Sequence, residues 1–166
     1  MLSALHNKRF NRIGRAIDMM CLFLGEDYSF VCKDERRIEV AEYSFHFQTQ
    51  WRFRENGKIL LASRDIYEPF DENVPENWEY DLFGRPDELS SVFDVYSKNL
   101  NAKMRGAVVQ DCYLSATNDV IIHFSNGVVF EQFTPSSQKD EEWRLIDYIH
   151  NTHTVCYNED GNISCE

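Results

Sequence analysis

The sequence predicts an α+β domain made mainly of antiparallel strands, with one helix packed on the sheet. Three observations lead to this prediction. Apolar and polar side chains alternate from residue 42 to 54, Asn-Gly pairs follow alternating segments in two places, and residues 86–102 carry apolar side chains at helical spacing. The 166 residues suffice for one domain, residues 1–166, with a sizeable core. A hydrophobic content of 43% and an aromatic content of 14% exclude general disorder.

The charge balance excludes some classes of partner. The chain contains 17 lysine and arginine residues and 28 aspartate and glutamate residues, which gives a formal net charge of -11. This disfavours non-specific binding to nucleic acid or anionic membrane, and it favours either a basic partner or plain solubility. No run approaches the ~18 apolar residues of a membrane span. Residues 1–15 lack the features of a signal peptide, and the five cysteines lack CxxC spacing, so we expect reduced thiols and a cytoplasmic location.

The first half of the chain reads as strands joined by tight turns. Residues 1–12 suggest a polar lead-in, and residues 13–24 fit either a helix or a buried strand. The alternation from residue 42 to 54 predicts one long strand with an aromatic face and a polar face. The Asn56-Gly57 pair favours a hairpin turn, after which residues 59–67 return beside that strand.

A loop and a helix separate the two halves. Residues 68–81 contain two prolines and six carboxylates, which rule out a regular central strand. We expect Phe70, Trp78 and Tyr80 to pin this loop to the body, because large aromatic side chains left in water forfeit favourable burial. The helix is predicted over about residues 86–102, with Pro86 at its first position and acidic residues beside it.

The second half reads as a meander. Strands are predicted over residues 107–115, 120–124 and 128–133, with Asn126-Gly127 turning between the last two. Residues 143–149 suit a strand or a short helix, and residues 155–157 and 163–165 suit a terminal hairpin.

The two halves, about residues 13–67 and 105–149, echo one another. Each has an apolar strand, an alternating strand and an Asn-Gly turn, and each contains a Trp-Arg pair, Trp51-Arg52 or Trp143-Arg144. The first half also has an inserted hairpin. This pattern predicts an internal duplication in which Asn56-Gly57 matches Asn126-Gly127, and it favours a strand at residues 19–24. Chance alternation in two β segments is the alternative.

A family resemblance accompanies this pattern. Two parts of the chain resemble a small uncharacterised group of bacterial proteins: the run from Asn118 to Phe130 followed by Glu141 to Leu145, and the first-half signature that includes Gly14 to Ala16, Trp51-Arg52 and Ser63 to Tyr67. Similar small families occur beside polymorphic toxins and are regarded as immunity proteins. The resemblance implies a toxin-neutralising role and no catalytic residues.

The candidate partner-binding residues lie around the acidic loop and in the strands before it: Arg52, Arg64, Asp65, Asp71, Glu72, Glu76, Trp78, Glu79, Tyr80 and Asp81. The Arg64-Asp65 pair could anchor a ligand or pair internally with Arg52 and the loop. The loop could hold a basic toxin through carboxylates placed around aromatic anchors, or it could be an ordinary solvated loop.

The sequence offers no motif for catalysis or metal binding. It contains no G-x-S-x-G, P-loop, Rossmann or HExxH pattern, and the loop carboxylates lack EF-hand spacing. His150 and His153 suit a surface pair without a third metal ligand. Cys156 and Cys165 could lie close across the terminal hairpin. We therefore expect no cofactor and no metal.

These observations favour a non-catalytic acidic binding protein of the immunity kind, acting on a basic protein and existing as a monomer or homodimer. The alternative is a small-molecule-binding domain or an enzyme with a cleft near Trp51 and Trp78. A third possibility is a homo-oligomer joined through sheet edges.

Overall fold

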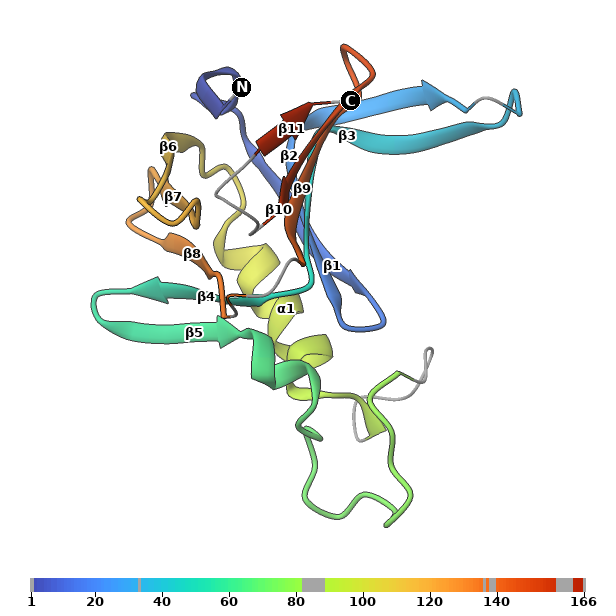
Figure 1. Cartoon of the computed structure of the whole chain (residues 1–166). Helices are drawn as coiled ribbons and strands as arrows, with labels where there is room; N and C mark the ends of the chain where they lie inside the picture. Colours follow the sequence, from blue (N-terminus) through green and yellow to red (C-terminus); the bar gives the residue numbers. More distant parts are fainter. Residues whose placement is uncertain are drawn as a thin grey trace.

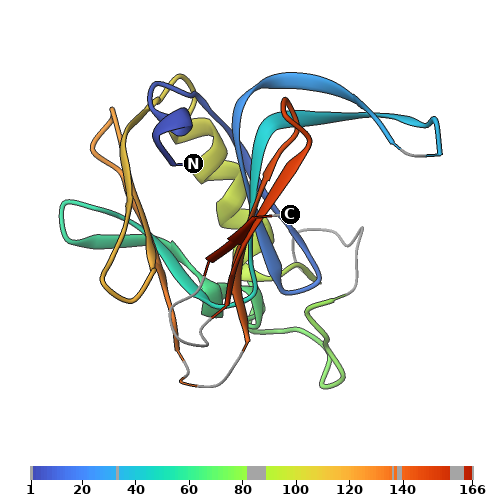
Figure 2. The same cartoon turned by 45° about the horizontal axis from the view of Figure 1, so that its top comes forward.

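The computed structural model describes residues 2–32, 34–81, 89–135, 137, 140–157 and 163–165. Within these residues the chain forms two antiparallel sheets and one α-helix, α1 (Val92–Lys103), so the predicted α+β class is confirmed. Figure 2 shows α1 lying between the two sheets, where it contacts one edge strand of each. Two short 3-10 turns, η1 (Leu2–Leu5) and η2 (Ser63–Ile66), complete the elements described.

The larger sheet has six strands in the order β1-β2-β3-β9-β10-β11 (Figure 1). Its members are β1 (Phe10–Ala16), β2 (Met19–Val31), β3 (Arg37–Phe47), β9 (Glu141–Asp147), β10 (Thr152–Tyr157) and β11 (Ile163–Cys165). The smaller sheet has five strands in the order β5-β4-β8-β7-β6. Its members are β4 (Gln50–Glu55), β5 (Lys58–Ala62), β6 (Val109–Leu114), β7 (Val120–Phe124) and β8 (Val129–Phe133).

The strand order of one sheet repeats that of the other. Each half of the chain supplies a three-stranded meander to one sheet, β1-β2-β3 or β6-β7-β8, and then a hairpin to the opposite sheet, β4-β5 or β9-β10. The two halves thus exchange hairpins, because β9 pairs with β3 and β4 pairs with β8. An internal duplication predicts such an arrangement.

The pairing registers match as well. Leu22 lies between Ile13 and Phe45 in the larger sheet, just as Ile122 lies between Cys112 and Phe130 in the smaller one. The first strand of each meander carries an irregularity at the corresponding place, between residues 10 and 12 in β1 and between residues 109 and 111 in β6. A β-bulge at the same position in both meanders is stronger support for an internal duplication than alternation is, because each bulge requires an extra residue in one strand.

This correspondence revises the predicted one. Trp51-Arg52 in β4 occupies the position that Trp143-Arg144 occupies in β9, so the Trp-Arg pair marks corresponding positions in the two halves. The match between Asn56-Gly57 and Asn126-Gly127 is wrong, because the first turn joins β4 to β5 and the second joins β7 to β8. The turns also differ in conformation, since both Asn56 and Gly57 have positive φ whereas in the second pair only Gly127 does. An Asn-Gly pair indicates a tight turn, but it does not indicate which two strands that turn connects.

The long strand predicted over residues 42–54 is broken in two. The chain leaves the larger sheet after Phe47 and enters the smaller sheet at Gln50. Phe45, Phe47, Trp51 and Phe53 are all buried, so the same side of the chain faces the core before and after the bend. Alternation continues through the corner, and for this reason it cannot distinguish one strand from two.

The predicted hairpin insertion in the first half is present. β2 pairs with β1 only as far as Leu24, and β9 pairs with β3 only from Tyr43 onward. Residues 25–42, which we call the arm, continue as a two-stranded ribbon that projects from the sheet (Figure 1). In the second half, residues 125–127 alone occupy the corresponding place between Phe124 and Val128.

The helix starts later than predicted. Residues 82–88 lie outside the described residues, and α1 begins at Val92. Ser91 is its N-cap: the Ser91 hydroxyl accepts a hydrogen bond from the Asp94 amide, and the Asp94 carboxylate accepts one from the Ser91 amide. This capping box, with a short acidic side chain at its third helical position, fixes the start of α1 at Val92.

A single core joins the two sheets and the helix. The Phe47 and Phe130 rings, one from each sheet, lie 4.9 Å apart, and the Trp51 ring contacts Phe93 of α1 at 5.9 Å. The predicted polar lead-in is only partly correct, because Leu5 is fully buried beside β6. In the terminal hairpin Cys165 lies opposite Thr154 and not opposite Cys156, which is a free thiol.

Candidate functional site

The predicted acidic loop, residues 68–81, leaves η2 and projects below the sheets in Figure 1. Its first residues are tied to the segment that leads into α1. The Phe70 amide donates to the Ser90 carbonyl at 2.9 Å, the Val92 amide donates to the Glu68 carbonyl at 2.9 Å, and Pro69 forms a bridge with Ser91. Backbone hydrogen bonds therefore hold the base of the loop.

Aromatic side chains fix the loop, as predicted. The Tyr67 and Tyr80 rings pack edge to face at 4.7 Å, and the Phe70 ring meets Tyr96 of α1 at 6.0 Å. The Trp78 indole donates to the Leu89 carbonyl at 2.8 Å. Three of these rings nevertheless stay largely open to solvent, with exposed fractions of 47% for Tyr67, 43% for Phe70 and 45% for Tyr96. We call these three residues the aromatic surface.

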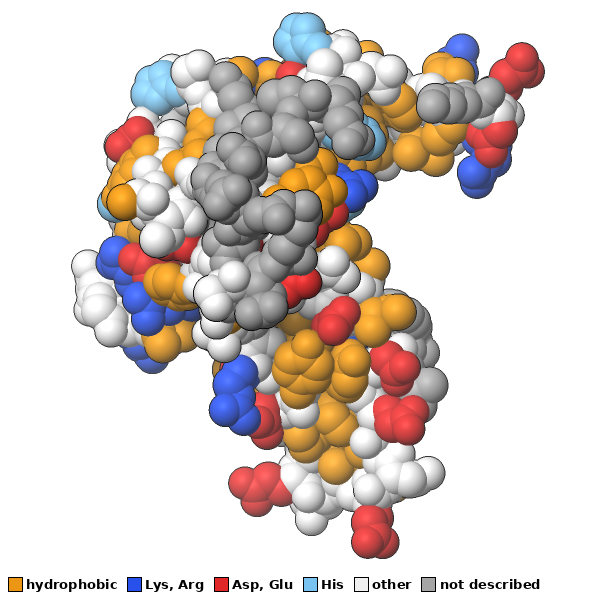
Figure 3. Space-filling view, in the orientation of Figure 1, with side chains coloured by type: hydrophobic (Ala, Val, Ile, Leu, Met, Phe, Trp, Pro, Cys, Tyr) orange, Lys and Arg blue, Asp and Glu red, His pale blue; other side chains and the backbone are white. Residues whose placement is uncertain are grey.

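The acidic loop also carries exposed carboxylates. Glu72, Glu76, Glu79 and Asp81 are exposed. Asp71 has a local role, because its carboxylate accepts hydrogen bonds from the Asn73 amide at 2.8 Å and the Asn73 side chain at 3.0 Å; these bonds lower the pKa of Asp71. Figure 3 shows hydrophobic side chains gathered on the projecting part of the molecule, with acidic side chains at its margin.

The prediction that Arg64 and Asp65 pair internally with Arg52 and the acidic loop is correct only for the loop, because Arg64 pairs with Glu68 whereas Arg52 pairs with Glu131. The Arg64 guanidinium is 87% exposed and lies 3.8 Å from Glu68. Asp65 accepts a hydrogen bond from the Ala62 amide at 2.8 Å and so caps η2. Burial raises the pKa of Asp65, against the Ala62 hydrogen bond, and nearby Glu68 raises it further. Only Arg64, at the base of the acidic loop, remains available to a partner.

Arg52 belongs to the sheet and not to the loop. Its guanidinium donates to Glu131 of β8 at 2.7 Å and lies 4.8 Å above the Phe133 ring. Arg54 donates to the other oxygen of Glu131 at 2.8 Å. Burial works to raise the pKa of Glu131, but the hydrogen bonds from Arg54 and Arg52 outweigh it, so the pKa is lowered. We assign Arg52 a structural role.

Sequence reasoning missed the residue that holds the loop against the helix. Arg15, at the end of β1, has a side chain that is only 5% exposed. It donates to both carboxylate oxygens of Asp94, at 2.7 and 2.8 Å, and to the Tyr80 carbonyl at 2.8 Å. Burial works to raise the pKa of Asp94, but the Arg15 and Ser91 contacts lower it. The Ser91-x-x-Asp94 spacing was the available signal for this end of the helix.

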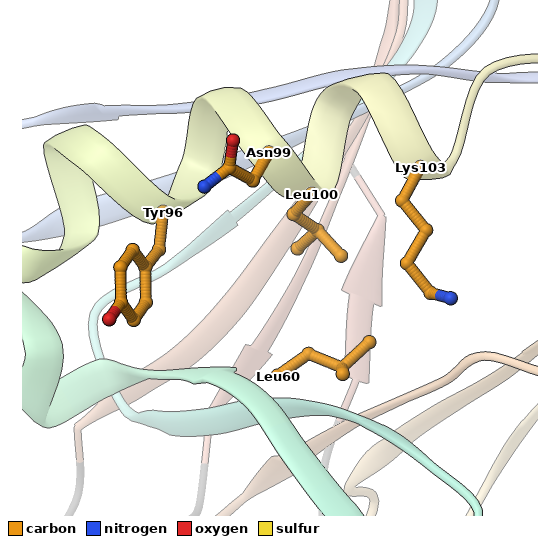
Figure 4. Close-up of a pocket in the computed structure, with 5 residues that line it drawn as sticks. All are labelled: Leu60, Tyr96, Asn99, Leu100 and Lys103. Atoms are coloured by element: carbon orange, nitrogen blue, oxygen red, sulfur yellow. The ribbon is translucent and has the colours of Figure 1, made fainter.

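A small pocket lies beside the aromatic surface, between α1 and β5 (Figure 4). Its volume is about 190 Å³. Four helix residues and one strand residue line it: Leu60, Tyr96, Asn99, Leu100 and Lys103. Its walls are mainly apolar, and the ammonium group of Lys103 is held by Glu55 at 2.8 Å.

The predicted cleft near Trp51 and Trp78 does not have Trp51 in its wall. Trp51 is 2% exposed, and its ring packs against Phe53 and Phe93 in the core. Trp78 instead borders a shallow hollow of about 490 Å³ together with Tyr67, Glu79, Tyr80 and Asp81. Of the predicted site residues, Trp78, Glu79, Tyr80 and Asp81 therefore line one hollow. Arg52 lies in the smaller sheet beside Glu131 and not in this hollow.

The described residues contain no cluster of three or more histidine, cysteine, aspartate or glutamate side chains placed to hold a metal ion. His150 contacts Asp147 at 2.7 Å on the surface. Burial raises the pKa of the Cys21 and Cys156 thiols to about 11 and that of Cys112 to about 12. Reactive cysteines have lowered pKa values instead, so these three thiols are suited to packing.

Known proteins give no information about this site. No protein-family model, curated protein or solved structure matches the chain. In the described part of the chain, no helix has the length and apolar character needed to cross a membrane.

Proposed function

We propose that this chain is a non-catalytic acidic binding protein that recognises a basic protein through the acidic loop and the aromatic surface. We further propose that it serves as an immunity protein, neutralising a cognate bacterial toxin by direct contact. The observation that carries the proposal is the placement of Tyr67, Phe70 and Tyr96, all more than 40% exposed, beside the exposed carboxylates of one projecting loop.

Physical reasons support a protein partner. Exposed aromatic rings that gather beside one another mark interaction sites more often than scattered apolar residues do. Aromatic side chains, tyrosine in particular, supply much of the binding energy at protein interfaces, because they bury a large area at a low cost in side-chain entropy. The carboxylates around them would attract a basic surface and accelerate association, and the net charge of -11 acts in the same direction.

The immunity role is tested with the product of the gene next to this one. We expect that gene to encode a basic protein that arrests growth when expressed alone, and we expect co-expression of this chain to restore growth. Titration calorimetry with the two purified proteins should give a complex whose affinity falls as salt is added. A neighbouring product that is neither basic nor toxic would contradict the immunity role.

The binding surface is tested by charge reversal with a matched control. The double variant Glu72→Lys/Glu76→Lys reverses two exposed carboxylates of the acidic loop, and Glu35→Lys/Glu39→Lys makes the same change in net charge on the arm. We expect the loop variant to weaken binding at least tenfold and the arm variant to change it much less, because charge acts most strongly at short range. Equal losses would indicate only a general charge effect and would refute the proposed surface.

A further inference from the structure

The pocket between α1 and β5 is large enough to accommodate one amino-acid side chain. Its volume of about 190 Å³ lies below the roughly 300–1,000 Å³ of pockets that enclose whole small molecules. Several waters would fill it when no partner is bound. Leu60, Leu100 and the Tyr96 ring form its walls, so those waters would have few hydrogen-bond partners and would be released favourably.

The pocket and the aromatic surface share a residue. In Figure 4 the Tyr96 ring stands at one end of the pocket and Lys103 at the other. The Tyr96 ring also contacts Phe70 of the acidic loop. A segment of a partner that covers Phe70 and Tyr96 would therefore reach the mouth of the pocket without turning away from the surface.

Charge differs between the two ends of the pocket. At the Lys103 end the ammonium group is neutralised by Glu55 at 2.8 Å. At the Tyr96 end the surface continues onto the loop, where Asp71 and Glu72 are adjacent in sequence, while Glu68 is paired with Arg64 at 3.8 Å. A positive charge is thus favoured on the loop side of any side chain that enters the pocket, and a negative charge there is disfavoured.

We propose that this pocket receives one large apolar side chain of the basic partner, with lysine or arginine residues directly beside that side chain on the side of the acidic loop. This inference rests on the proposed function, because it specifies what part of the partner the same surface binds. Interface hot spots are typically anchors seated in desolvated pockets, with surrounding contacts that exclude water, and charges beside such an anchor add specificity.

The first test uses short peptides as probes and the methyl resonances of Leu60 and Leu100 as the readout. Acetyl-Lys-Lys-Gly-Phe-amide should shift both methyl signals. The peptide with alanine in place of phenylalanine should bind about tenfold more weakly, as expected for the lost apolar area. The peptide with two glutamates in place of the lysines should also bind more weakly at low salt. Equal affinities for the phenylalanine and alanine peptides, or for the lysine and glutamate peptides, would overturn the inference.

The second test blocks the pocket without disturbing the fold. Asn99 is exposed at its rim, so Asn99→Trp should cover it, whereas Gln110→Trp places the same side chain at an exposed position in β6. Asn99→Trp should abolish the methyl shifts and weaken binding of the basic partner at least tenfold, and Gln110→Trp should do neither. If the partner binds wild type and Asn99→Trp equally well, this inference fails while the proposed function stands. If the peptides fill the pocket but the neighbouring basic protein does not bind, the proposed function fails instead.

Discussion

The two halves of the chain share a strand order and differ in what is attached to it. The first half carries the arm, residues 25–42, where the second half has only residues 125–127. The second meander is preceded by the helix α1, whereas the first is preceded only by the short turn η1. The repeated strands contribute most of the core, and the candidate binding surface lies entirely on η2, the acidic loop, α1 and the adjoining strand β5. The repeated strands thus supply most of the core, and the surface is built from the segments outside the repeat together with β5.

The largest expected effect tests whether the two tryptophans are equivalent. Trp51 and Trp143 are both buried and occupy corresponding strands. Replacing either by alanine should lower the free energy of unfolding by about 4 kcal/mol, measured by urea denaturation. Trp143→Ala should cost more, because the Trp143 indole also donates to the Asn118 carbonyl at 2.9 Å. A large loss at only one tryptophan would break the comparison between the halves.

The next effect concerns a contact that only the first half makes. Arg15 corresponds in register to Leu114, so Arg15→Leu exchanges one half's residue for the other's. The variant should lose about 3 kcal/mol of unfolding free energy, because it leaves the partly buried Asp94 carboxylate without its guanidinium. As a control, Arg64→Leu removes an 87% exposed guanidinium and should change stability by less than about 0.5 kcal/mol.

The Arg15 contact also has a defined pH dependence. The pKa of Asp94 is lowered in the folded protein. Its charged form therefore stabilises the fold fully above the unfolded pKa of about 3.9, and this contribution is lost as the pH falls through the folded pKa. The stability difference between wild type and Arg15→Leu should hence be largest near neutral pH and shrink below about pH 4. A difference that does not change with pH would show that Arg15 acts through packing alone.

A smaller effect is expected from making the first half resemble the second. Replacing residues 25–42 by Ser-Asn-Gly would join Leu24 to Tyr43 as residues 125–127 join Phe124 to Val128. We expect a folded protein that has lost about 2 kcal/mol, since the ion pair between Lys8 and Glu42 and the ring contact between Phe30 and Tyr148 disappear. Cooperative urea unfolding would support an inserted arm, and loss of cooperativity would contradict it.

The smallest effect has the opposite sign. Glu142 precedes Trp143 as Gln50 precedes Trp51, but Glu142 is 2% exposed, and neither carboxylate oxygen has a hydrogen-bond partner among the described residues. Burial raises the pKa of Glu142, against the Thr134 side chain, with Asp140 and Asp119 raising it further. A raised folded pKa means that stability is lost as the pH rises from the unfolded pKa through the folded pKa.

Glu142→Gln should therefore raise the unfolding free energy by about 1 kcal/mol at neutral pH, because a carboxyl whose pKa is raised by folding destabilises the fold above its unfolded pKa. Below the unfolded glutamate pKa of about 4.3 the gain should disappear, because both side chains are then neutral. Urea denaturation at pH 4 and pH 7 measures the difference. Destabilisation at both values would mean that the carboxylate has a partner.

Much of the candidate site was predictable, and its gaps have physical causes. Prolines and clustered carboxylates predicted the loop, and Trp78 and Tyr80 anchor it as expected. The roles of Arg52 and Arg15 could not be inferred, because each depends on a carboxylate 79 residues away in sequence. The pocket was not predicted either, since it arises where Leu60 of β5 faces Leu100 of α1.

By itself the sequence determined the local elements: the α+β composition, the alternating strands, the Asn-Gly turns, the inserted hairpin and the loop. These follow from patterns within a few residues, which depend on backbone conformation and on which side chains face the core. Which sheet each strand joins depends on the tertiary structure, because a chain that bends between Phe47 and Gln50 keeps the same side chains buried in either sheet. The exchange of hairpins, the equivalence of Trp51 and Trp143, and the surface beside α1 all depend on this choice of sheet.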